Sequence, residues 1–211
     1  MEWFNLIENS IGLLFLLCYA YQIFYVVDVL ATKPRYVPKS KALYRYAFVI
    51  SARNEEKVIG GLIDSLHQQD YPKELFDIFV VADNCTDNTA SLCRDKGAHV
   101  YERFNRVQVG KGYALDYLFK QMKKDQVFDD YDAFVVFDAD NIVDKGYIRA
   151  MNDTFSMGYR AITSYRNSKN YESNWISAGY SLWFLREAKY LNQARMNLNT
   201  SCAVSGTGFL V

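Results

Sequence analysis

Two aspartates stand one residue apart at the end of an apolar run, in the segment FVVFDADN at residues 134–141. Residues two positions apart on an extended backbone point to the same side, so we expect the carboxylates of Asp138 and Asp140 to converge on one cation. Carboxylate oxygens suit Mg2+ or Mn2+, which complete their coordination with water and substrate phosphate. The segment therefore predicts a divalent-metal site for a nucleotide diphosphate, although a solvated turn capped by aspartates has the same pattern.

Two further polar loops follow apolar runs. The loop SARNEE comes after YAFVI, and in it we predict that Asn54 caps the next helix while Glu55 and Glu56 occupy its first turn. The loop DNCTDNT comes after DIFVVA, where Asp83 is placed to accept a hydrogen bond from the imide N–H of a uracil-like base. Capping and ordinary turn chemistry account for the same residues, so both interpretations stay open.

The glycines around Lys111 do not form a known phosphate-binding fingerprint. Asn105 stands where the first glycine of a Walker loop would be, and Tyr113 replaces its Ser or Thr. The pattern G-x-G-x-x-G is also missing after the first apolar run. Lys111 at the start of a helical pattern can still reach a phosphate by its charge, with a surface lysine as the alternative.

Apolar runs and amphipathic helical patterns alternate from residue 46 onward. The expected strands are YAFVIS, DIFVVAD, AHVYERF and DAFVVFDAD. Strands that are apolar on both faces and alternate with helices predict an α/β fold, with a mostly parallel central sheet and helices on both faces. Ligands of such sheets bind beyond the carboxyl ends of the strands, which is where the three polar loops stand.

The amino-terminal segment is apolar enough to cross a bilayer. Residues 11–27 contain one amide, Gln22, and no charge, which predicts one transmembrane helix, with a helix packed on the domain as the alternative. Glu2 and Glu8 precede this segment, and five basic residues follow it by residue 45, which places the rest of the chain in the cytoplasm. We predict a single-pass protein of the cell membrane, with a membrane helix at 1–32, a basic linker at 33–45 and one domain at 46–211.

Charge and cysteine content exclude several classes of protein. The 211 residues include 24 basic and 24 acidic side chains, so no global field favours nucleic acid as a partner. The four cysteines form no C-x-x-C pair, and this argues against a zinc site or a disulfide framework.

The ordered segments FVISARNEE, VVADNCTDNT, VGKGYAL, VVFDADN and SGTGFLV resemble family-2 glycosyltransferases with the Rossmann-like GT-A fold. The likeness covers residues 46–211 and is closest to membrane-associated inverting enzymes of the cellulose synthase-like and poly-N-acetylglucosamine synthase-like type. It implies a UDP-sugar donor, a glycan or lipid-linked acceptor, and Mg2+ or Mn2+ held by Asp138 and Asp140. The residues that it implies for nucleotide-sugar binding are Ala52, Asn54, Glu55, Asp83, Lys111 and Asp138. Those that it implies beside the acceptor sugar are Gly206, Gly208 and Phe209.

The chain also departs from that family. Neither its Thr-Glu-Asp or Glu-Asp motif, which carries the general base, nor its Q-x-x-R-W motif occurs here, so no catalytic residue is identifiable. We therefore expect the base beyond Val211 and interpret the chain as truncated. The alternative is a nucleotide-sugar-binding or regulatory protein without transferase activity. A nucleotidyltransferase is disfavoured because no glycine-rich loop follows the first strand.

A further helix is predicted within SNWISAGYSLWFLREAKYLNQAR at residues 173–195. The resemblance places this segment near the acceptor or the membrane interface. Its hydrophobic pattern alone favours a helix of the protein core.

Overall fold

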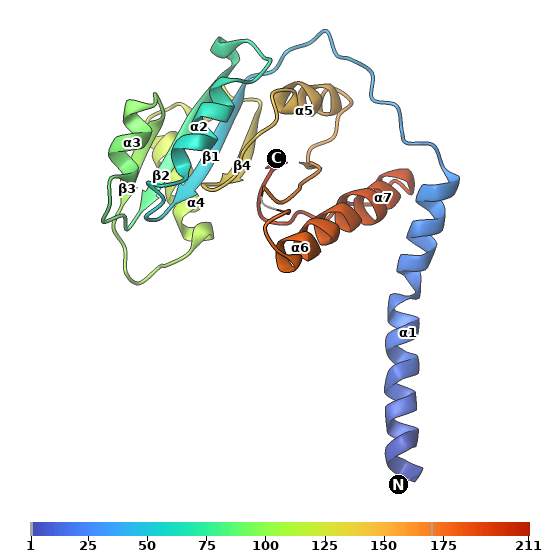
Figure 1. Cartoon of the computed structure of the whole chain (residues 1–211). Coiled ribbons are helices and arrows are strands. Elements are labelled where there is room, and N and C mark those ends of the chain that lie inside the picture. Colours follow the sequence, from blue (N-terminus) through green and yellow to red (C-terminus); the bar gives the residue numbers. More distant parts are fainter. Residues whose placement is uncertain (1, 170) are drawn as a thin grey trace. The chain divides into compact units, whose positions relative to one another are not determined.

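The computed structural model describes residues 2–169 and 171–211, which form two compact units. The first unit comprises residues 1–36 and 164–203, and the second comprises residues 37–163 and 204–211. Residues 164–203 group with the first unit, whereas the sequence predicts one domain at 46–211. Figure 1 labels the helices α1–α7 and the strands β1–β4 as they are named below.

The second unit is built on a six-stranded sheet with the order β3-β2-β1-β4-β6-β5. Four strands are mutually parallel, and β6 runs antiparallel to both β4 and β5. The mostly parallel sheet predicted from the alternating runs is confirmed. The strand bounds are β1 Tyr46–Ala52, β2 Phe76–Asp83, β3 His99–Arg103, β4 Ala133–Asp138, β5 Ile162–Thr163 and β6 Phe209–Leu210.

Helices cover both faces of this sheet, as predicted. One core contains buried residues of α2, α3 and α5, and the other contains those of α4, which lies on the opposite side of the strands (Figure 1). The helix bounds are α2 Ile59–His67, α3 Thr89–Asp95, α4 Lys111–Lys124 and α5 Tyr147–Phe155, with short 3-10 helices η1 Lys73–Leu75 and η2 Phe128–Asp130. Gly97 adopts a φ of +81° just after α3, as expected of a residue that ends a helix.

The central strand β1 shows why both faces need covering. Phe48 and Ile50 enter the core with α2, whereas Ala47 and Val49 enter the core with α4. Successive residues of a strand point to opposite faces, so a nearly continuous apolar strand requires packing partners on both sides. This burial fixes β1 in the middle of the sheet and brings the loop after it to the candidate site.

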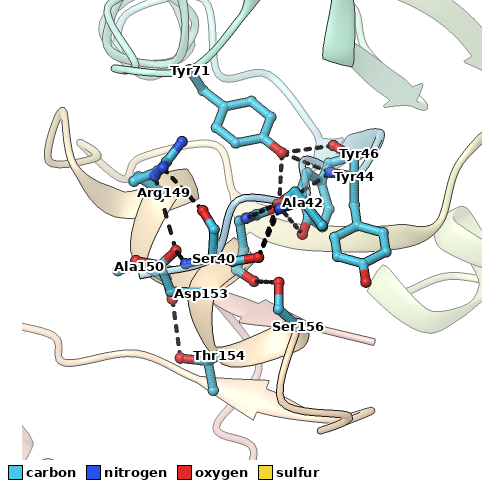
Figure 2. Close-up of polar contacts among 11 residues, drawn as sticks. Ser40, Ala42, Tyr44, Tyr46, Tyr71, Arg149, Ala150, Asp153, Thr154 and Ser156 are labelled. Carbon is cyan, nitrogen blue, oxygen red and sulfur yellow. Dashed lines mark hydrogen bonds and ion pairs between the residues drawn. The ribbon is translucent and has the colours of Figure 1, made fainter. Parts of the chain in front are cut away.

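The chain just before β1 is held against α5 rather than extended as a free linker. The buried side chain of Asn152 bonds to Tyr44, Tyr46 and Tyr71, and it donates to the carbonyl of Ala42 at 2.9 Å. Figure 2 shows these contacts around the Tyr71 hydroxyl, together with those of Ser40 to Asp153 and Arg149. The predicted linker at 33–45 is therefore part of the folded unit from about Ser40 onward.

The first unit contains α1 Glu2–Ala31 and a second helical segment made of α6 Trp175–Arg186, the π-helix η3 Glu187–Asn192 and α7 Gln193–Asn197. Of the described helices, only α1 is long and apolar enough to span a membrane, and its apolar window is not buried by the protein. The expectation of a core helix at 173–195 is wrong, because Ser181 is the only buried residue of α6. Five of its large apolar side chains are exposed instead, namely Trp175, Ile176, Tyr180, Leu182 and Trp183.

Candidate functional site

The loops that follow β1, β2 and β4 meet at the carboxyl edge of the parallel strands. The register pairs Ser51 with Asp138 and Ala52 with Ala82, so the strands β4, β1 and β2 end side by side. The order of the sheet places β2 and β4 on either side of β1. This is the position where parallel α/β sheets bind ligands.

The two aspartates of the DAD segment are not both on the strand. Strand β4 ends at Asp138, and the chain then turns, with the N–H of Asn141 donating to the carbonyl of Asp138 at 3.2 Å. Asp140 is exposed in this turn, and Ala139 between them is buried. The expectation of an extended backbone through Asp140 is wrong, because packing of Ala139 into the core directs the chain away from the sheet.

Lys111, the first residue of α4, points its ammonium group at Asp138. The ammonium also donates to the carbonyl of Gly206 at 2.5 Å, and the Asp138 side chain remains 45% exposed. Lys111 thereby joins the metal-binding candidate to the acceptor-side segment at 206–209. The Lys111 ammonium neutralises the Asp138 carboxylate in this structure. A metal cation would compete with Lys111 for Asp138, and a substrate phosphate would compete with Asp138 for Lys111.

The acceptor-side segment is also tied to the aspartate turn by Thr207. Its hydroxyl accepts from the N–H of Asp138 at 2.8 Å and donates to Asn141 at 2.5 Å. Gly206 and Gly208 adopt φ values of +80° and +65°, which favour glycine, and only Phe209 of the three predicted acceptor-side residues lies in a strand. Sequence reasoning missed Thr207, although its place between two glycines was a usable signal.

Glu55 faces the same carboxylates from the loop after β1. Burial, followed by the negative charges of Asp140, Asp87 and Asp138, raises the pKa of the Glu55 carboxyl above its ordinary value. Repulsion among carboxylates of this kind is relieved by a bound cation. The three oxygen donors Glu55, Asp138 and Asp140 thus have the chemistry that Mg2+ or Mn2+ prefers.

The residues fit a metal ion shared with a substrate better than a metal held by protein alone. Among the described residues, no group of three or more His, Cys, Asp or Glu side chains has the arrangement of a complete metal site. Mg2+ commonly binds through one or two carboxylates plus substrate phosphates. Asp138 and Asp140 can supply that share of the coordination, and a nucleotide diphosphate would supply the remainder.

The loop after β1 is not a helix cap. Helix α2 begins at Ile59, so the predicted capping by Asn54 and the placement of Glu55 and Glu56 in the first turn are wrong. Asn54 instead adopts a φ of +56° and accepts a hydrogen bond from the N–H of Thr86 at 2.8 Å. The Asn54 side chain therefore joins the loops after β1 and β2, which fixes one wall of the site.

The loop after β2 is held by Asp87. Its carboxylate accepts hydrogen bonds from the hydroxyl and N–H of Thr89 and from the N–H of Glu56. Partial desolvation opposes the effect, but these hydrogen bonds lower the pKa of Asp87. The contact with Glu56 is a second link between the two loops.

A cavity of about 700 Å3 opens beside these loops, at the ends of β1, β2 and β3. Its lining includes Arg53, Asn84, Cys85, Phe104 and Arg106, but neither Asp138 nor Asp140. The cavity and the carboxylates therefore lie at neighbouring positions rather than at one point. The exposed ring of Phe104 offers a stacking surface, and two guanidinium groups offer positive charge.

Asp83 lies buried behind this cavity, not in its lining. Its carboxylate accepts from Arg103 at 2.6 Å and from the amide of Asn84 at 3.0 Å, and both charged side chains are about 5% exposed. Arg103 also donates to the carbonyl of Gln108 at 2.7 Å, which anchors the loop before α4. Contact of Asp83 with a base stays a prediction. The sequence analysis missed Arg103, although it ends the strand paired with β2 and lies opposite Asp83 in the register.

The backbone of Ala52 contacts the loop after β2, and contact with a nucleotide stays a prediction. Ala52 is buried at the end of β1, and its carbonyl accepts a weak hydrogen bond from the thiol of Cys85 at 3.5 Å. Burial raises the pKa of Cys85, so this thiol stays protonated as a donor near neutral pH.

A mostly parallel sheet with a cavity, a lysine and carboxylates at its carboxyl edge defines an α/β protein of the GT-A type. The family assignment is specific. Residues 44–211 match the model of the family described as "Glycosyltransferase like family 2", and the chain belongs to this family. The predicted family is thus confirmed at this level.

Similar proteins agree with that assignment. Over 114 residues the chain is 32% identical to the beta-monoglucosyldiacylglycerol synthase of Synechocystis, an alignment that covers 51% of this chain and 22% of the relative. The chain therefore spans about a fifth of the length of that relative.

Solved structures share the fold at low sequence identity. The mannosyltransferase PcManGT from Pyrobaculum calidifontis, in complex with GDP-Man and Mn2+, has a TM-score of 0.58 at 18% identity, with 76% of this chain and 47% of that chain covered. Glucosyl-3-phosphoglycerate synthase from Mycobacterium tuberculosis, in complex with UDP, has a TM-score of 0.51 at 21% identity, with 85% and 62% covered. These likenesses support the fold.

Proposed function

We propose that this chain is the donor-binding part of a membrane-anchored, inverting glycosyltransferase that uses a UDP-sugar and Mg2+ or Mn2+. The observation that carries the proposal is the gathering of Glu55, Asp138 and Asp140 at the carboxyl edge of the sheet, where burial and the neighbouring negative charges raise the pKa of Glu55. The family assignment supports sugar transfer as the reaction class.

Each residue has a proposed part in donor binding. Asp138 and Asp140 would hold the divalent ion, which stabilises the negative charge of a departing nucleoside diphosphate when it is bound. Lys111 would move its ammonium group from Asp138 to the diphosphate, since both are anionic. The neighbouring cavity would hold the nucleoside, with Ala52, Asn54 and Asp83 behind its wall.

The acceptor side is proposed at the segment 206–209. Gly206, Gly208 and Phe209 lie next to the aspartate turn because Thr207 and Lys111 bind both segments. A lipid or lipid-linked acceptor is favoured over a soluble glycan, because the Synechocystis relative is named for a glucosyldiacylglycerol product. The exposed apolar helix α1 would anchor the chain in the cell membrane, with the second unit on the cytoplasmic side.

Titration calorimetry of the detergent-solubilised full chain with UDP tests the proposal. We expect binding that requires Mn2+ and that falls at least about tenfold in Asp138→Ala/Asp140→Ala, since each lost ion contact costs on the order of 1 kcal/mol or more. The matched control is Asp129→Ala/Asp130→Ala, which removes two exposed carboxylates at the other end of β4.

The outcomes separate the alternatives. Equal UDP affinity in wild type and the Asp138/Asp140 double variant would contradict the proposed metal site. Metal-dependent consumption of a UDP-sugar offered together with diacylglycerol vesicles would contradict the alternative of a nucleotide-sugar-binding protein without transferase activity.

A further inference from the structure

Helix α6 presents its apolar side chains outward. Trp175 is 83% exposed and Trp183 is 58% exposed, and Ile176, Tyr180 and Leu182 are exposed as well. The spacing 175, 179, 183 and 176, 180 puts these positions on one side of the helix. On the other side Ser181 is buried, and Phe184 and Leu185 are half-buried. A helix of a water-soluble surface has the opposite arrangement, so this face requires an apolar partner.

The same compact unit places this helical segment beside the end of α1. Arg186 donates to the side chain of Gln22, and Asn197 donates to Asp28 at 2.9 Å. The guanidinium of Arg195 lies 6.0 Å from the ring centre of Tyr25. These contacts begin only at Gln22, and every described side chain from Trp3 to Tyr21 is exposed.

The lengths of the two parts of α1 locate the bilayer surface. At about 1.5 Å per residue, the fully exposed part from Trp3 to Tyr21 is about 28 Å long, close to the roughly 30 Å of a hydrocarbon core. The remaining turns of α1 carry Gln22 and Asp28, which are polar and already paired with the helical segment. If α1 spans the bilayer, the boundary between hydrocarbon and headgroups falls near Gln22, and α6 and η3 lie at that level.

The charge of the segment matches an anionic surface. Residues 164–203 contain five basic side chains and two acidic ones, and Lys33 and Arg35 follow α1 directly. Trp and Tyr concentrate at the headgroup level of membranes, and basic residues there gain from anionic lipids. Neither the exposed aromatic side chains nor the excess of basic residues is expected of a helix that only connects two segments.

We propose that α6 is a membrane-docking helix, which lies on an anionic lipid bilayer with Trp175, Ile176, Tyr180, Leu182 and Trp183 among the headgroups. This inference rests on the proposed membrane anchor α1. Docking would hold residues 164–203 at the lipid surface, so that the chain has a second attachment to the bilayer besides the span itself. Such an attachment suits an enzyme whose acceptor is a lipid.

The three tryptophans of the chain make the test direct, because Trp3 reports on α1 while Trp175 and Trp183 report on α6. The full chain is reconstituted into vesicles of phosphatidylcholine with phosphatidylglycerol, some carrying bromine at defined depths of the acyl chains. The Trp3→Phe variant shows only the α6 signal, and the matched Trp175→Phe/Trp183→Phe variant shows only the α1 signal. Circular dichroism confirms that both variants are folded.

We expect the emission of Trp3→Phe to shift to the blue in vesicles and to be quenched most strongly by the shallowest bromines. Replacing phosphatidylglycerol by phosphatidylcholine should weaken that quenching. If bromines quench Trp3 but the α6 tryptophans respond only to aqueous iodide, α1 is inserted and the docking proposal is wrong. Protection of the α6 tryptophans from both quenchers would mean a protein partner and would also overturn it. Failure of bromines to quench Trp3 would instead contradict the anchor.

Discussion

The titration of Glu55 reports on the electrostatics of the candidate site. Burial and the charges of Asp140, Asp87 and Asp138 raise its pKa above 4.5, so the folded protein holds this proton more tightly than the unfolded chain does. The folded state then binds more protons in the window that starts near pH 4.5, and the stability contributed by this group is lost as the pH rises through the folded-state pKa. The Glu55 carboxylate therefore destabilises the folded state at neutral pH, as charged residues of ligand-binding sites often do.

We predict that Glu55→Gln is more stable than wild type at pH 7 and equal to it below about pH 4, because the neutral amide removes the repulsion. Thermal unfolding of both proteins across that pH range measures the difference. Saturating Mn2+ with UDP should remove the advantage of the variant, since a bound cation offsets the same repulsion. A stability difference that does not change with pH would contradict the electrostatic interpretation.

The buried ion pair between Arg103 and Asp83 joins the ends of β3 and β2. Both side chains are about 5% exposed, so removal of one leaves an uncompensated charge inside the protein. We predict that Arg103→Ala lowers the free energy of unfolding by about 3–5 kcal/mol. Denaturation of the detergent-solubilised chain measures this change.

The matched control for that prediction is Arg94→Ala. Arg94 pairs with Glu102, but the two side chains are 49% and 40% exposed. Water screens such pairs, so its loss is expected to cost less than about 1 kcal/mol. Similar effects of the two variants would mean that burial does not govern the Arg103 pair.

At the level of elements, α5 acts as a clamp on the chain that enters β1. Asn152 is fully buried in α5 and satisfies groups of Ala42, Tyr44, Tyr46 and Tyr71 at once (Figure 2). A buried group that loses its partner costs more than the bond itself gained, because its hydration is not restored. The clamp therefore holds the segment directly before β1 against α5.

We predict that Asn152→Ala destabilises the protein by about 2–4 kcal/mol, since it removes four hydrogen bonds and takes the partner of the buried Tyr46 hydroxyl away. Amide hydrogen exchange should also quicken at Tyr44, whose N–H donates to the Asn152 side chain. The control is Thr154→Ala in the same helix, whose hydroxyl bonds only to the carbonyl of Ala150 (Figure 2). Unchanged exchange at Tyr44 in Asn152→Ala would refute the clamp.

At the level of the whole molecule, the formal net charge is zero, but the two units differ in where their apolar side chains lie. The second unit buries its apolar residues in two cores on either side of a sheet. The first unit exposes its apolar residues on α1 and α6, and its polar residues pair between helices instead. This inversion is expected where the surrounding medium is lipid, because apolar surface then gains nothing from burial within the protein.

Local sequence patterns were sufficient for the parallel sheet, the helices on both faces and the edge that carries the site. Those features follow from periodicity and from the alternation of short elements, which neighbouring residues determine. The grouping of residues 164–203 with α1, the outward face of α6 and the pairing of Asp83 with Arg103 depended on contacts between distant segments. Only the tertiary structure decided these, because a residue's exposure and charge environment depend on what packs against it. The position of Ala139 in the core belongs to the same group, since residues distant in the sequence bury it.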